Sequence, residues 1–178
     1  SLRRADRWAR YDFTVALDDL EITVEEGEMR GLVGANGAGK TTILNVIGGQ
    51  IVADSGVVRV GGREVERLSP WQRAGLGIGR TFQESRMWAD LTAAEHLRIA
   101  VAASARIMAG RASRDHAIHD ICSLVELPKS ILERTPTQLR LLDRRRVELG
   151  MAAINASSLL LIDEIGAGMI IAVMGLKD

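Results

Sequence analysis

Residues 34–42 read Gly34-Ala35-Asn36-Gly37-Ala38-Gly39-Lys40-Thr41-Thr42, with the spacing G-x-x-x-x-G-K-[ST]. Glycines at this spacing let the backbone curl so that successive N–H groups point at phosphate oxygens. Lys40 can then reach the β- and γ-phosphates of a nucleotide, and the Thr41 hydroxyl is placed to bind Mg²⁺. Residues 29–33 before the loop predict a short buried strand, and the apolar residues within 43–47 after it have helical spacing. This context favours a phosphate-binding loop over a glycine-rich turn without a ligand.

The composition of the 178-residue chain predicts one domain with enough apolar residues for a core. Lys plus Arg and Asp plus Glu each number 23, and this balance gives no electrostatic case for binding nucleic acid. Cys122 is the single cysteine, so no internal disulfide can form, which fits a reducing compartment. No apolar run approaches the roughly 18 residues of a membrane span, and the charged residues 1–7 are unlike a signal peptide. We expect a soluble chain that can dock on a membrane protein.

A second chemical motif follows the apolar run 158–162, which leads directly into Asp163-Glu164. Such a run is typical of a central parallel strand, and it would deliver both carboxylates to the sheet edge where ligands bind in open α/β folds. Asp163 can hold Mg²⁺ directly or through water, and Glu164 can polarise an attacking water. Alone, the pattern fits an ordinary solvated strand end equally well. With the phosphate loop upstream, it predicts a site for nucleotide hydrolysis.

The remaining elements are predicted from periodicity and turn residues. Residues 22–25 alternate, residues 57–60 followed by Gly61-Gly62 predict a strand and a hairpin turn, and residues 75–82 predict a strand loosened by glycine. From Thr92 onward the pattern is helical. Thr92 and Glu95 form a predicted capping box, Ser113 is the expected cap of a second helix, and a third helix is expected over about 138–153.

Six segments, in this order, resemble the ATPase subunit of an ABC transporter, most closely the branch that takes up branched-chain amino acids. They are residues 16–19, 34–42, 77–83, 91–95, 145–149 and 159–164. The stretch Gly-Ile-Gly-Arg-Thr-Phe-Gln at 77–83 is fairly specific to that branch, and the match covers nearly the whole chain up to Met169. The resemblance implies an α/β fold. Its parts would be a P-loop NTPase core with a mostly parallel sheet, an antiparallel β portion near the N-terminus and a helical subdomain over about 84–151.

The resemblance also implies roles for single residues. Tyr11 stands where the family places an aromatic ring that stacks on adenine, although an ordinary surface tyrosine fits as well. Gln83 matches a glutamine that senses Mg²⁺ and water, and its amide offers both an acceptor and donors. Residues 85–88 lie where such ATPases face a coupling helix of the membrane subunit. Trp88 fits a docking groove or, equally, an anchor for the helical subdomain.

The signature segment departs from the family pattern. The usual Leu-Ser-Gly-Gly-Gln aligns on Leu139-Arg140-Leu141-Leu142-Asp143, so the serine hydroxyl and both glycines are absent. Backbone N–H groups survive such substitution, and a helix that begins here can still present them to the γ-phosphate held by an opposing subunit. Arg140 can supply charge to phosphate, or it can simply occupy a solvated helix face together with Asp143.

The C-terminal segment is a second departure. Family members continue through a helix, another strand and a histidine that contacts the γ-phosphate, but only a dozen residues follow Gly166. A parallel crossover alone needs about that many. Residues 173–178 resemble the segment after that histidine, which predicts a single domain, 1–178, lacking an internal piece after Met169. His116 and His119 share a helix face, where solvent exposure is favoured over a metal site for want of further ligands.

These patterns together predict the ATP-binding and ATP-hydrolysing subunit of an ABC importer, with ATP and Mg²⁺ as cofactors. The expected solutes are branched-chain amino acids or related small polar molecules. The expected partners are transmembrane permease subunits and a second ATPase subunit, identical or different, at the cytoplasmic face of the inner membrane. The alternative is a regulatory ATP-binding switch with little turnover, which the altered signature and the absent histidine favour. A GTPase-type switch is disfavoured because the chain has no Asn-Lys-x-Asp motif.

Overall fold

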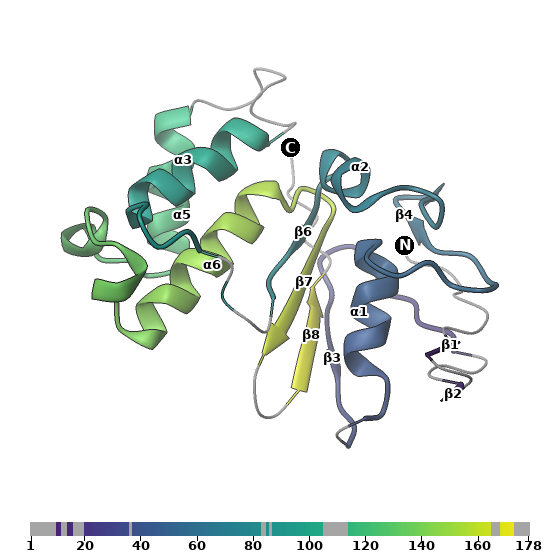
Figure 1. Cartoon of the computed structure of the whole chain (residues 1–178). Coiled ribbons are helices and arrows are strands. Elements are labelled where there is room, and N and C mark those ends of the chain that lie inside the picture. Colours follow the sequence, from purple (N-terminus) through teal and green to yellow (C-terminus); the bar gives the residue numbers. More distant parts are fainter. Residues whose placement is uncertain are drawn as a thin grey trace.

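The computed structural model describes residues 10–11, 14–15, 20–35, 37–82, 85, 87–104, 114–164 and 168–172. Its centre is a four-stranded sheet with the order β3–β8–β7–β6 (Figure 1). These strands are β3 Met29–Leu32, β6 Ile78–Arg80, β7 Leu159–Glu164 and β8 Gly168–Ala172. β6 pairs with β7 in parallel, whereas β8 pairs antiparallel with both β7 and β3. Hence β3, β6 and β7 run in one direction and β8 runs against them.

The reversed strand β8 follows from the length of the connection before it. Only residues 165–167 separate β7 from β8, and a parallel return would need a crossover of a dozen or more residues. The chain therefore turns back beside β7 and fills the position between β7 and β3. Met169 and Ile170 are consecutive residues of β8. The missing piece inferred between them stays a prediction.

The strand before the glycine-rich loop is not buried, so that expectation is wrong. Met29 is 71% exposed, Arg30 and Gly31 are exposed, and Leu32 is half-buried. The physical reason is position: among the described strands β3 pairs only with β8, which makes β3 an edge strand of the sheet. A short stretch such as residues 29–33 does not by itself distinguish a central strand from an edge strand.

Helices cover both faces of the sheet, which gives the α/β layering that the motifs predicted (Figure 1). α1, Lys40–Gly48, lies on one face, and α6, Leu141–Asn155, lies on the other. The side chains of β7 alternate accordingly: Leu159 and Leu161 pack into the cluster that contains Leu44 and Ile47 of α1, whereas Leu160 packs with Ala152 of α6. β7 is thus buried on both faces, as its continuous apolar run predicted.

Several of the described helical elements gather around α6. They are α3 Ala93–Ala103, α5 Arg114–Leu124 and two 3₁₀ turns, η1 Lys129–Ile131 and η2 Pro136–Gln138. A second apolar cluster joins them, with Leu97, Ile121 and Val147 at its centre. The capping box is confirmed, because the Thr92 N–H donates to the Glu95 carboxylate at 2.7 Å and the Glu95 N–H donates to Thr92 Oγ1 at 3.3 Å. Ser113, the expected cap of the second helix, lies outside the described residues.

The short strands sit apart from the central sheet. β1 Arg10–Tyr11 pairs antiparallel with β2 Thr14–Val15, and β4 Arg59–Val60 pairs antiparallel with β5 Arg63–Glu64. The turn between β4 and β5 has φ values of +57° at Gly61 and +78° at Gly62, so the predicted hairpin turn is confirmed. A helix that the patterns did not predict, α2 Pro70–Gly75, follows a capping box built by Ser69 and Gln72.

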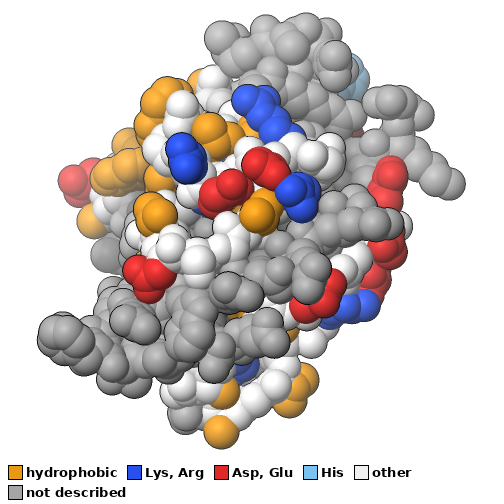
Figure 2. All heavy atoms as spheres, turned by 90° about the vertical axis from the view of Figure 1, so that its right-hand side faces the viewer, with side chains coloured by type: hydrophobic (Ala, Val, Ile, Leu, Met, Phe, Trp, Pro, Cys, Tyr) orange, Lys and Arg blue, Asp and Glu red, His pale blue; other side chains and the backbone are white. Residues whose placement is uncertain are grey.

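The surface of the described residues mixes both charges. Figure 2 shows acidic and basic side chains interspersed with apolar ones on the face seen from the right-hand side of Figure 1. The ion pairs of the described residues include Arg30–Glu28, at 2.7 Å, and Arg59–Glu64. None of the helices in the described part of the chain has both the length and the hydropathy needed to span a bilayer.

Strand β6 packs so closely on α6 that Gly79 has no room for a side chain. A Cβ there would lie 2.8 Å from the Ala156 Cβ and closer still to the Ala152 carbonyl oxygen. We expect Gly79→Ala to lower the free energy of unfolding by about 1–3 kcal/mol through overpacking. Urea denaturation of the variant and of the unmodified chain measures this difference in the free energy of unfolding. Gly31→Ala in β3 is the matched control, because a Cβ there meets nothing within 4 Å, and an equal loss in both variants would contradict this account.

Candidate nucleotide site

Three strand ends meet at one edge of the sheet. β3 ends at Leu32, β6 at Arg80 and β7 at Glu164, and because these strands run in the same direction their C-terminal ends share that edge. Leu32 lies opposite Met169, which in turn lies opposite Asp163. Two strand spacings, about 10 Å, therefore separate the last residue of β3 from the carboxylate strand. The sheet places the two sequence motifs side by side.

The glycine-rich loop leads into α1 through left-handed backbone positions. Gly37 has φ +83° and Gly39, the N-cap of α1, has φ +81°, values that residues with a Cβ adopt only with strain. The first helical hydrogen bond runs from the Ile43 N–H to the Gly39 carbonyl at 2.9 Å. The N–H groups at the start of α1, on Lys40, Thr41 and Thr42, have no intrahelical partner by geometry. Together with the helix dipole, they offer an exposed site for an anion.

Lys40 folds back over the loop that precedes it. Its Nζ donates to the Gly34 carbonyl at 2.6 Å and to the Ala35 carbonyl at 2.8 Å. A Cβ at Gly34 would lie 3.3 Å from the Ala38 Cβ, so a side chain there would crowd the curl of the loop. The ammonium group is thus held at the loop, where Lys40 was predicted to meet phosphate charge. Thr41 is exposed and Thr42 is half-buried at the first turn of α1.

Asp163 lies at the end of β7, in the alternation that places Leu159 and Leu161 toward α1. The residue is only 7% exposed, and its backbone N–H donates to Thr81 Oγ1 at 3.0 Å. Burial raises the pKa of the Asp163 carboxyl above its ordinary value, and the positive charge of Arg80 opposes that shift. A buried carboxylate beside an anion site is a suitable ligand for a hard cation, because a cation would offset the cost of its burial.

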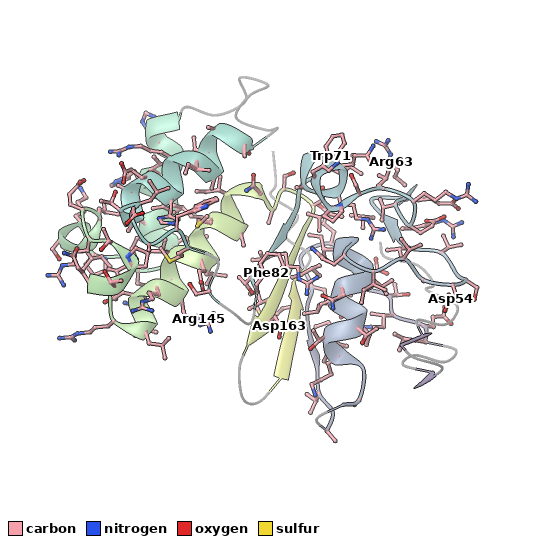
Figure 3. All side chains as sticks on the ribbon, in the orientation of Figure 1. Asp54, Arg63, Trp71, Phe82, Arg145 and Asp163 are labelled. Carbon is pink, nitrogen blue, oxygen red and sulfur yellow. The ribbon has the colours of Figure 1, made fainter. Side chains whose placement is uncertain are left out.

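The segment after β6 joins the site to the helical part of the molecule. Figure 3 shows Phe82 and Asp163 in the middle of the molecule, with Arg145 of α6 on the side of the helices. The Arg145 guanidinium donates to the Phe82 carbonyl at 3.3 Å and to Glu148 at 2.9 Å. The backbone immediately before Gln83 is therefore bonded to α6.

Four predicted site residues are described only in part or not at all. Asn36 and Gln83 lie outside the described residues. Tyr11 belongs to β1 and Glu164 ends β7, but their side chains lie outside the description. The adenine-stacking role of Tyr11 and the roles of Gln83 and Glu164 stay predictions.

The signature segment opens a helix, as its alignment predicted. α6 begins at Leu141 rather than near residue 138, because residues 136–138 form the turn η2. Arg140 is the N-cap and makes no side-chain cap hydrogen bond. Leu141 and Leu142 are 70% and 61% exposed. The first turn of α6 thus presents two apolar side chains where the family pattern has glycine.

The histidines do not form a metal site. His116 and His119 are exposed on α5, and no group of three or more His, Cys, Asp or Glu side chains within the described ranges could hold a metal ion. His96 is fully buried and packs against the Trp88 ring at 5.7 Å. Its Nδ1 bonds to the Thr92 carbonyl and its Nε2 accepts from the Trp88 N–H at 2.9 Å, a pairing that requires the proton on Nδ1.

A cleft of about 380 Å³ opens between the sheet side and the helical side of the molecule. Its walls come from α2, β6 and the segment after it, α3 and α6. Among the lining residues are Arg73, Arg80, Phe82, Trp88, Ile99 and Glu148. The wall is mostly apolar, and Trp88, which is 56% exposed, contributes to it while also stacking on His96.

Two arginines in this cleft wall were not predicted as functional. Arg73 is 1% exposed, and Arg80 reaches the middle of α1 through the Leu44 carbonyl at 2.8 Å. Arg80 belongs to the stretch 77–83 that carried the family resemblance, but neither arginine was assigned a role. The contacts of such arginines depend on tertiary partners that a sequence does not show.

Comparison with known proteins shows the family. The family described as "ABC transporter" matches residues 17–167, and the chain belongs to that family. The chain is 33% identical over 155 residues to the sulfate/thiosulfate import ATP-binding protein of Chromobacterium violaceum, with 87% of this chain and 40% of that protein covered. It is 28% identical over 171 residues to the high-affinity branched-chain amino acid transport ATP-binding protein of Pseudomonas aeruginosa, with 90% and 67% covered.

Solved structures agree on the fold. A dimeric ATP-binding cassette in a post-hydrolysis state, bound to ADP and Pi, has a TM-score of 0.74 at 24% identity, with 92% of this chain and 72% of that chain covered. The α/β fold with a P-loop NTPase core is thereby confirmed. The chain spans less than half the length of the first curated relatives it matches, at 40%, 42% and 44%.

Proposed function

We propose that this chain binds ATP at the shared edge of β3, β6 and β7. The single observation that supports this most strongly is the meeting of the glycine-rich loop and Asp163 at that edge. The phosphates would lie against the N–H groups at the start of α1 and the Lys40 ammonium. The loop residues proposed to line this cradle are Gly34, Asn36, Gly37, Ala38, Gly39, Lys40, Thr41 and Thr42. Tyr11 is the proposed stacking partner of adenine.

Mg²⁺ fits the donor set at this edge. Thr41 offers a hydroxyl at the start of α1, and Asp163 offers a buried carboxylate whose pKa is raised by burial. Thr41, Gln83 and Asp163 are the residues proposed to hold the ion, which would neutralise phosphate charge. Glu164, the next residue after Asp163, is the proposed general base that takes a proton from the attacking water. These roles make the chain an ATPase.

The proposed biological role is that of an ATP-binding subunit in an ABC importer, peripheral to the cytoplasmic face of the inner membrane. Transmembrane permease subunits would dock in the apolar cleft, because its exposed Trp88 and Ile99 suit an apolar partner helix. A second ATPase subunit, identical or different, would place its α6 start against the bound nucleotide. The relatives' names include sulfate/thiosulfate, methionine and branched-chain amino acid transport.

Branched-chain amino acids or related small polar solutes are the proposed cargo. The support is the Gly77–Gln83 stretch and the likeness to the Pseudomonas aeruginosa protein. This cargo would be bound by other subunits, so the residues of this chain select the permease rather than the solute.

A regulatory ATP-binding switch with little turnover is the second candidate. Leu141 and Leu142 at the first turn of α6 favour it, because they replace the small residues that let a phosphate approach helix N–H groups closely. In this reading nucleotide binding changes conformation and hydrolysis is incidental.

An ATPase assay with permease-containing vesicles separates the two candidates. We expect the 178-residue chain alone to hydrolyse ATP very slowly, since a histidine at the γ-phosphate is absent from its sequence, and permease to raise the rate. Ile99→Asp, at 41% exposure in the cleft wall, should abolish the stimulation. Leu124→Asp is the matched control, because Leu124 is 62% exposed on α5 and does not line the cleft. A permease-independent rate in the unmodified chain would favour the regulatory switch.

A further inference from the structure

The buried arginine Arg73, on α2, holds the C-terminal end of α1. Its Nη1 donates to the Val46 carbonyl at 2.6 Å and to the Ile47 carbonyl at 2.7 Å. The same guanidinium also donates from Nε to the Leu68 carbonyl at 3.0 Å and from Nη2 to the Glu66 carbonyl at 2.9 Å. One planar cation thus ties the last turn of α1 to the segment that leads into α2.

A second arginine, Arg80 at the end of β6, holds the same helix closer to its middle. Its Nη1 donates to the Leu44 carbonyl at 2.8 Å, and its Nη2 donates to Asn45 Oδ1 at 2.6 Å. The guanidinium carbon also lies 5.1 Å from the centre of the Phe82 ring. Arg80 therefore joins α1 to the strand next to β7 and to the segment before Gln83.

The C-terminal half of α1 suits both cations, because the carbonyl groups near the end of a helix carry the negative end of its dipole. The Val46 carbonyl accepts from the Gly49 N–H at 3.2 Å as well as from Arg73. Gly48 and Gly49 leave the space: a Cβ at Gly48 would lie 2.9 Å from Arg80 Nη1, and one at Gly49 would lie 2.8 Å from Arg73 Nε.

The other end of the same helix is the phosphate loop. α1 has nine residues, a length of about 14 Å at 1.5 Å per residue, and is too short to absorb a displacement by bending. A shift of its last turn would therefore move Lys40 and Thr41 at its first turn. We propose that Arg73 and Arg80 are positioning residues, which hold the C-terminal half of α1 and thereby place the phosphate loop for ATP. This role rests on the proposed ATP binding.

The arginines also form part of the cleft wall. Both line the cleft into which a permease is proposed to dock, so the same two side chains contact the cleft and the nucleotide helix. The positioning role itself requires no occupant in the cleft, and it can be tested on the chain alone.

Binding of ATP carrying a mant fluorophore on its ribose provides the test. Arg80→Met should raise the dissociation constant at least fivefold while the fluorescence at saturation stays unchanged. Arg80→Lys should raise the dissociation constant about two- to threefold, because one ammonium keeps part of the hydrogen bonding. Arg73→Lys should also raise the dissociation constant, since an ammonium cannot reach carbonyls on both α1 and the segment that leads into α2. Repeating the titration in EDTA should preserve these losses, which separates them from any effect on Mg²⁺ at Asp163.

Arg67→Met is the control, because Arg67 is exposed on the same segment. Its dissociation constant should stay within about twofold of the unmodified chain. Lower saturation with an unchanged dissociation constant would mean that the arginines act only in folding, and it would overturn the proposal. The proposal would also be overturned if both Arg80→Met and Arg73→Lys bound ATP with an unchanged dissociation constant. It would likewise fail if the losses of affinity vanished in EDTA, or if Arg67→Met lost affinity equally. Absence of binding by the unmodified chain would overturn the proposed ATP binding first, and this inference with it.

Discussion

Replacing Glu164 by glutamine is expected to reduce ATP turnover at least about 100-fold while ATP affinity stays within about twofold. Glu164 ends β7 directly after the buried Asp163, at the edge where the phosphate loop lies. A general base typically contributes a factor of about 10²–10⁴, and an amide of the same shape cannot take the proton of the attacking water. Removal of a negative charge near the phosphates gives no reason for weaker binding. Phosphate release from radiolabelled ATP in the presence of permease-containing vesicles measures the turnover, and mant-ATP titration measures the affinity.

The control for this variant is Glu133→Gln, an exposed carboxylate among the helices. Glu133→Gln should change neither the turnover nor the affinity. This control tests whether the loss of a surface charge alone lowers the rate. Equal losses of affinity and turnover in Glu164→Gln would assign Glu164 a structural role at the end of β7 instead. Unchanged turnover would remove it from the reaction.

Local patterns predicted those parts of the fold that local chemistry decides. The Thr92–Glu95 capping box and the Gly61-Gly62 hairpin turn appear as predicted, because each depends on residues within a few positions. The glycine-rich loop likewise opens a helix, with left-handed backbone at Gly37 and Gly39. The burial of β7 on both faces could also be predicted, since a strand covered on both faces needs an unbroken apolar run.

Features that depend on distant partners could not be predicted in this way. Met29 begins the stretch that was predicted as a buried strand, yet it is exposed because β3 is an edge strand among the described strands. The insertion of β8 between β3 and β7 depends on which strands compete for one position in the sheet. Arg73 looks like any surface arginine of a short helix until the carbonyls of Val46 and Ile47 appear beside it.

In the candidate site, too, features set by local sequence could be predicted and contacts between distant residues could not. The residue types at the phosphate loop and at Asp163 were evident from spacing, and the sheet brings their strand ends to one edge. The bond from the Asp163 N–H to Thr81 Oγ1 spans 82 positions of sequence and was not predicted. The same holds for the bond from Arg145 to the Phe82 carbonyl, which connects the helices to the site.

Replacing Lys40 by alanine is expected to weaken ATP binding by about 1.5–3 kcal/mol, a factor of roughly 10–150 in the dissociation constant. The ammonium lies at the loop, bonded to the Gly34 and Ala35 carbonyls, where phosphate charge would meet it in a charge-assisted contact. Since these two bonds are at an exposed position, their loss should change the thermal midpoint little. Calorimetric titration with ATP, together with a thermal melt of the same sample, measures both quantities.

Lys129→Ala is the matched control, because Lys129 is exposed on η1 among the helices. If long-range attraction between any lysine and the nucleotide accounted for the effect, both variants would lose affinity, and raising the ionic strength would erase the loss. A direct contact predicts instead that only Lys40→Ala loses affinity and that most of the loss persists in salt, because a charge-assisted hydrogen bond is short-ranged. An unchanged affinity in Lys40→Ala would remove the ammonium from the site and leave the N–H groups at the start of α1 as phosphate ligands that the described part of the loop supports.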